Sequence, residues 1–86
     1  MSEENQLIIP PAASEDAASF EILRVWIAND QQQLTLETGV WEDPAAWGIM
    51  LADLARHIAK SYHQENGLDE AATLRRIKAG IDVELG

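Results

Sequence analysis

Two stretches of the chain alternate apolar and polar residues as β-strands do. The first runs from Phe20 to Ala28, is rich in β-branched and aromatic residues, and ends at Asn29-Asp30, whose side chains favour turns. The second runs from Gln33 to Thr38 and places Leu34 and Leu36 on one side. The pattern predicts an antiparallel β-hairpin.

The expected pairing of these strands gives the hairpin one continuous apolar face. A turn over residues 29–32 is expected to bring Ile27 opposite Leu34 and Val25 opposite Leu36. Since such a face has to be buried, we expect a helix to cover it.

The first residues of the chain differ in character from the rest. Residues 1–18 are mostly acidic or small and are expected to form a mobile acidic arm. Within this arm, Leu7 to Ile9 precede Pro10-Pro11 and could add to the sheet as a short edge strand, because proline ends a strand and is tolerated at sheet margins. The sequence leaves open whether this third strand forms.

The second half of the chain has the spacing of two helices. The first is expected to start at Asp43-Pro44, run to about Gln64 and stop at Asn66-Gly67. Its apolar stripe comprises Trp47, Met50, Leu51, Leu54, Ile58 and Tyr62, with Ala55 and Ala59 beside it. The second starts at Leu68-Asp69 and has a thinner stripe made of Leu74, Ile77, Ile81 and Leu85.

Together these elements predict an α+β fold. An antiparallel β-hairpin, with or without a short third edge strand, packs against a long helix and is followed by a second, C-terminal helix. We expect residues 19–86 to form this single ββαα domain and residues 1–18 to form the arm.

Charge and composition exclude several classes of partner. Fifteen acidic and six basic residues give a net charge of -9, which repels phosphate backbones, so we expect no nucleic-acid binding. The longest apolar stretches are too short to span a membrane, and no basic segment precedes Leu7 as a secretory signal would require. The chain has no cysteine and therefore no disulfide. A cytoplasmic location is expected.

Few residues suggest catalysis or metal binding. His57 follows Asp53 by four residues, so both can lie on one helix face as a base and its partner or as two metal ligands. Glu37, Glu42 and Asp43 cluster near the start of the long helix. Because a third ligand at matching spacing is absent and Asp43 suits a helix cap, we predict no metal site, no cofactor and no catalytic residue.

A second apolar surface needs an explanation. Phe20, Ile22 and Trp26 share the face of the first strand opposite the one described above, and Trp41 precedes the long helix. The second helix, the N-terminal segment or an identical chain could cover this surface. We favour the identical chain and predict a homodimer that uses these four residues.

Part of the sequence resembles a known family. The stretch from Leu23 to Ala28, the stretch from Thr38 to Gly48 and the stretch from Leu51 to His57 are similar to a family of short uncharacterised bacterial proteins, known as a domain of unknown function. The resemblance implies a bacterial origin and a small stand-alone domain, and it transfers no activity.

The sequence therefore predicts a non-enzymatic interaction or regulatory module that associates with itself. The alternative is a small ligand-binding or metal-binding domain, or an enzyme, that uses acidic residues and His57. A third possibility is an adaptor whose acidic arm engages a basic protein partner.

Overall fold

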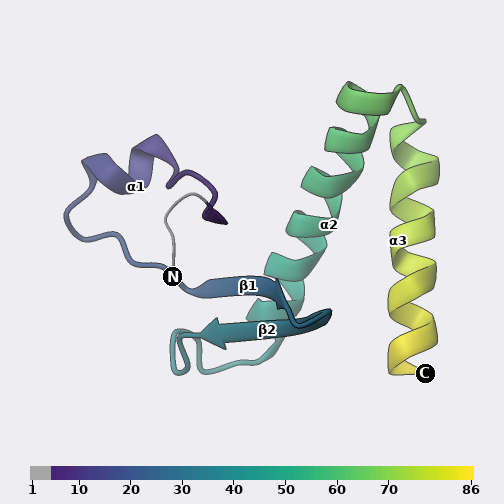
Figure 1. Ribbon diagram of the computed structural model, residues 1–86. Coiled ribbons are helices and arrows are strands. Elements are labelled where there is room, and N and C mark those ends of the chain that lie inside the picture. The colour runs from purple at the N-terminus through teal and green to yellow at the C-terminus, as the bar shows by residue number, and fades with distance from the viewer. Residues whose placement is uncertain (1–4) are drawn as a thin grey trace. The chain divides into compact units, whose positions relative to one another are not determined.

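The computed structural model describes residues 5–86, so the first four residues of the predicted acidic arm lie outside the described part. The chain folds as two units, residues 1–40 and 41–86. The first contains α1 (Pro11–Glu15), β1 (Leu23–Ala28) and β2 (Gln31–Leu36), and the second contains α2 (Ala45–Asn66) and α3 (Glu70–Leu85). Figure 1 shows the α+β content that the sequence predicts: a two-stranded hairpin, a long helix and a C-terminal helix.

The hairpin is antiparallel, as predicted, but its register and bounds differ from the expectation. Val25 lies opposite Leu34, whereas the sequence pattern placed it opposite Leu36. The cause is the turn, which consists of Asn29 and Asp30 alone, with φ of 55° and 60°. Two successive positive φ values suit a two-residue hairpin turn, because its twist matches that of the strands, and Asn and Asp tolerate this conformation.

The bounds of both strands differ from the predicted ones. The second strand covers Gln31–Leu36 in place of residues 33–38, because the two residues assigned to the loop are already paired. The first begins at Leu23 and not at Phe20, although the Ile22 carbonyl still accepts a hydrogen bond from the Glu37 N–H at 2.9 Å. Among residues 5–86 the sheet has these two strands only, so Leu7 to Ile9 do not pair with it here.

One short helix was not expected from the sequence. α1 is a single turn that starts with proline, whose fixed φ suits the first helical position, and it buries no residue. The prediction that residues 1–18 form an arm beside a single domain over residues 19–86 stays a prediction, as does the packing of the sheet against the long helix.

The helices of the second unit begin and end close to the predicted residues. Asp43 Oδ1 accepts a hydrogen bond from the Ala45 N–H at 3.0 Å, and Gly67 ends α2 in the left-handed conformation. Asp69 caps α3 by accepting from the Ala72 N–H at 2.9 Å. No helix in the described part of the chain is long and apolar enough to cross a membrane.

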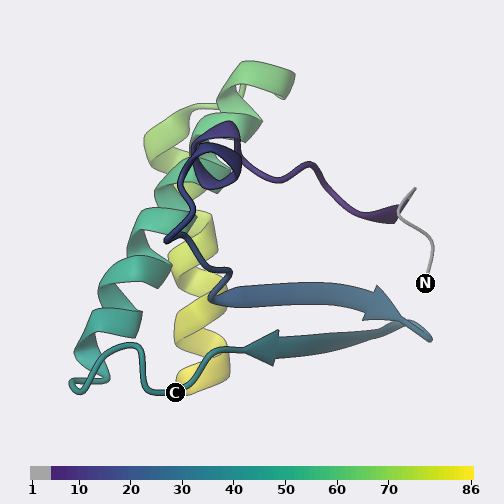
Figure 2. The same cartoon turned by 90° about the vertical axis from the view of Figure 1, so that its left-hand side faces the viewer.

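α2 and α3 form a helical hairpin that is tightest near its connection. In Figure 1 the helices lie closer together beside the turn than at their other ends, and Figure 2 shows that they cross at an angle. Ala55 and Ala59 of α2 are buried, whereas Ile81 and Leu85 near the end of α3 are exposed. Small side chains let the two backbones approach each other, so the buried line of α2 consists of alanines.

Candidate interaction surface

One face of the β-hairpin is almost entirely aliphatic. This aliphatic face consists of Leu23, Val25, Ile27, Leu34 and Leu36. Leu23 lies opposite Leu36 and Val25 lies opposite Leu34, so four of the five side chains form cross-strand pairs. Val25 and Leu34 are 50% and 48% exposed, and Ile27 at the turn end is 73% exposed. The face therefore remains open in the first unit.

The other face of the hairpin is centred on Trp26. Alternation places Ile22, Arg24 and Trp26 together on this side, which we call the Trp26 face. Arg24 donates two hydrogen bonds to the Glu21 carboxylate, from Nε to Oε1 at 2.9 Å and from Nη2 to Oε2 at 3.2 Å. The two side chains of this ion pair are partly exposed, and Arg24 lies on the same side of the strand as Trp26.

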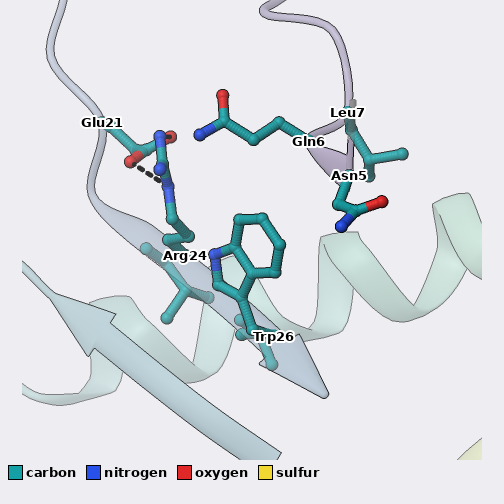
Figure 3. Close-up of a pocket in the computed structure, with 8 residues that line it drawn as sticks. Asn5, Gln6, Leu7, Glu21, Arg24 and Trp26 are labelled. Atoms are coloured by element: carbon teal, nitrogen blue, oxygen red, sulfur yellow. Dashed lines mark hydrogen bonds and ion pairs between the residues drawn. The ribbon is translucent and has the colours of Figure 1, made fainter. Parts of the chain in front are cut away.

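The N-terminal segment stands beside the Trp26 face without pairing to it. Asn5, Gln6 and Leu7 line a cavity of about 220 Å³ together with Glu21 and the β1 residues from Leu23 to Trp26. In Figure 3 the Gln6 side chain extends towards the Glu21 and Arg24 pair, and the Asn5 side chain points towards Trp26. The cavity thus separates the segment from β1.

The predicted surface residues fall in both units. Ile22 and Trp26 share one face of the hairpin and are half-buried, while Phe20 lies before β1 and is 65% exposed. Trp41 belongs to the second unit, where its ring meets that of Trp47 edge-to-face with the centroids 5.1 Å apart. Their use in an interface stays a prediction.

Sequence reasoning missed the polar neighbours of Trp26. Had β1 started at Phe20, alternation would have placed Glu21 and Arg24 on opposite faces. Because Glu21 precedes the regular strand, its carboxylate can reach Arg24. The position of Asn5 and Gln6 depends on the path of the chain through α1, which no local pattern indicates.

The residues considered for chemistry are dispersed. The Asp53 carboxylate lies 3.3 Å from Arg56 Nη1, on an exposed part of α2, and His57 is exposed. The Asp43 carboxylate accepts the Ala45 N–H at the start of α2, where Pro44 is the N-cap residue. Within residues 5–86 no three His, Asp or Glu side chains lie close enough to hold a metal ion.

Comparisons with known proteins place the chain in a family. It is 31% identical to a protein from the photosynthetic bacterium Rhodopseudomonas palustrus CGA009, whose solved structure is described as that of a "putative pyruvate dehydrogenase". The likeness covers 100% of this chain and 87% of that one, with a TM-score of 0.79. A search of the curated proteins found no match. Residues 6–86 match the family described as "Domain of unknown function (DUF5076)", and the chain therefore belongs to that family.

Proposed function

We propose that this protein is a non-enzymatic, cytoplasmic interaction module that works as a homodimer. The observation that carries the proposal is that both faces of the hairpin hold apolar residues, so a covering helix would bury only one of them. Val25, Ile27 and Leu34 are exposed on the aliphatic face, and Ile22 and Trp26 lie on the other face. A cluster of aliphatic side chains on one surface is typical of a site that another surface covers.

The size of the hairpin supports the same conclusion. A two-stranded sheet is marginal in water by itself and needs further strands or a packed layer. Completing the burial of a half-exposed Val, Leu or Ile side chain is worth about 1 kcal/mol, so four such residues contribute roughly 4 kcal/mol per copy. Association is therefore a physically reasonable way to stabilise this unit.

The Trp26 face is the second part of the proposed surface. Phe20, Ile22 and Trp26 remain the aromatic and aliphatic anchors of the sequence prediction, and Trp41 remains a separate candidate in the second unit. Tryptophan is enriched at the centres of interfaces because it buries a large area and keeps one polar group. A different protein partner could use the same residues.

Sedimentation measurements test the proposal directly. We expect the full chain to sediment at twice its monomer mass at micromolar concentration, and we expect Trp26→Ser to shift this equilibrium towards the monomer by at least about tenfold, since losing one interface tryptophan costs about 2 kcal/mol. A chain that is still monomeric at roughly 100 µM would contradict self-association, because the free energy of pairing is then weaker than about -5.5 kcal/mol.

The alternative is a ligand-binding or metal-binding domain, or an enzyme, that uses acidic residues and His57. The description of the Rhodopseudomonas palustrus protein makes pyruvate the ligand to try first. Under the proposed function, the melting temperature is expected to stay unchanged with pyruvate and with divalent metal ions. A ligand that binds the folded state at 100 times its dissociation constant would add about 2.7 kcal/mol, so a clear rise in melting temperature would favour the alternative.

A further inference from the structure

The outer edge of β1 is unpaired. The Glu37 N–H donates to the Ile22 carbonyl, so these two residues are a hydrogen-bonded pair of the ladder. Because hydrogen-bonded pairs alternate with non-hydrogen-bonded ones in an antiparallel sheet, Arg24 and Trp26 also bond to β2. Leu23, Val25 and Ile27 therefore direct their N–H and C=O groups away from β2. No backbone hydrogen bond from another described segment reaches these three residues. The edge can accept another strand.

The sequence of β1 is complementary to itself about Val25. If two copies of β1 pair antiparallel with Val25 at a two-fold axis, Leu23 of one copy lies opposite Ile27 of the other on the aliphatic face. On the Trp26 face, Arg24 of each copy lies opposite Trp26 of the other, which suits stacking of a guanidinium on an indole ring. Every cross-strand pair in this arrangement is favourable.

Neighbouring registers are less favourable. An axis at Arg24 places two guanidinium groups opposite each other, and like charges in directly opposed positions destabilise a sheet. An axis at Trp26 sets the two tryptophans opposite each other, but it places Arg24 opposite Ala28 and so removes both contacts between arginine and tryptophan. The register about Val25 is therefore preferred.

The edge of β2 lacks this complementarity. Its outward-directed residues are Gln32, Leu34 and Leu36, and an axis at Leu34 places glutamine opposite leucine on the aliphatic face. The other face then pairs Gln33 with Thr35 and contributes no aromatic contact. β1 is the better edge for a second copy.

We infer that two copies of the chain pair through their β1 edges, antiparallel and centred on Val25, to form one four-stranded sheet. The inference rests on the proposed homodimer and names its surface. Both aliphatic faces join into one larger face, in which side chains contact each other across the new strand pair but which the pairing itself does not cover, and both Trp26 faces do the same. The N-terminal residues Asn5 to Leu7, which line the cavity beside β1, move aside to admit the second strand.

Amide hydrogen exchange tests the pairing without any mutation. At a concentration where sedimentation shows the dimer, the amides of Leu23, Val25 and Ile27 are expected to exchange at least tenfold more slowly than after dilution to the monomer. The amides of Leu34 and Leu36 face the other edge and serve as the internal control, with no dependence on concentration. Protection of the β2 amides in place of the β1 amides would overturn the inference.

Single-cysteine variants provide an independent test, since the chain has no cysteine of its own. Val25→Cys places two thiols on residues whose Cα atoms are about 5.5 Å apart, within disulfide range. Leu34→Cys is the matched control, because Leu34 faces Val25 in the hairpin and is equally exposed. In the proposed sheet the two Leu34 positions are three strand spacings apart, about 14 Å, which is too far for a disulfide.

The outcomes separate this inference from the function it rests on. Rapid oxidation of Val25→Cys to a covalent dimer, with no covalent dimer formed by Leu34→Cys, supports the β1 edge. A dimer by sedimentation that shows neither the crosslink nor the β1 protection overturns the edge pairing and leaves the proposed function standing. A chain that is monomeric throughout overturns both.

Discussion

A chain that carries Val25→Asp is expected to be monomeric at concentrations where the unchanged chain is a dimer. In the proposed sheet the substitution places two carboxylates opposite each other, about 5.5 Å apart. Like charges at that distance repel by about 1 to 3 kcal/mol, and each copy also loses about 1 kcal/mol of aliphatic burial. The dissociation constant should rise at least about 100-fold, as measured by sedimentation over a concentration series.

Mixing complementary variants shows whether this effect arises at the two-fold axis. Val25→Lys should also be monomeric, because it repels its own copy in the same way. An equimolar mixture of Val25→Asp and Val25→Lys places opposite charges across the axis and should form a heterodimer, visible by native mass spectrometry. Only folded hairpins can pair like this, so recovery also shows that neither variant is misfolded.

The control variants change Leu34 of β2, which lies opposite Val25 in the hairpin. Leu34→Asp and Leu34→Lys introduce the same charges at a position of equal exposure, but the two copies of residue 34 do not meet in the proposed sheet. Mixing these variants should give no preference for the heterodimer. If the mixed Val25 variants form no heterodimer while the mixed Leu34 variants do, the two-fold axis lies at β2. The assignment of the axis to Val25 is then wrong.

The hairpin shows which features of a sheet can be predicted from sequence. Alternation correctly grouped Val25 with Leu34 on one face, although the expected register was wrong. The error arose from the turn, where Asn29 and Asp30 both adopt positive φ and make a loop of two residues. Because the register changed by an even number of residues, each side chain kept its face.

The candidate surface was less predictable than the fold, because it depends on contacts between segments. Trp26 could be selected for its size and its position in an alternating strand. The ion pair between Glu21 and Arg24 requires the strand to begin at Leu23, and the cavity requires Asn5 to return beside β1. These features follow from the three-dimensional path of the chain and not from residue spacing.

The helical hairpin illustrates a similar limit. The spacing of its large apolar residues correctly predicted a long helix, and Asp43 and Gly67 marked its ends. Those large residues suggested the line along which the helix is buried, yet the fully buried position is Ala59. A short connection forces the helices close together near their joined ends, and only small side chains fit between them.

Replacing Ala59 with aspartate is therefore expected to have the largest effect on stability in the second unit. Ala59 is 0% exposed, so the new carboxylate would be buried without a partner or would force the two helices apart. An unpaired buried charge costs several kcal/mol, and we expect the free energy of unfolding to fall by at least about 3 kcal/mol. For a domain of this size, such a loss removes most of its stability.

A matched variant separates burial from helix propensity. Ala52→Asp introduces the same residue into the same helix at an exposed position, so it carries only the intrinsic cost of aspartate in a helix, about 0.7 kcal/mol. Urea unfolding followed by circular dichroism should give Ala59→Asp a much lower midpoint than Ala52→Asp. Equal midpoints would mean that α3 does not cover Ala59 in solution. The difference between the two variants thus measures the contact between α2 and α3 directly, because aspartate costs the helix the same amount at both positions.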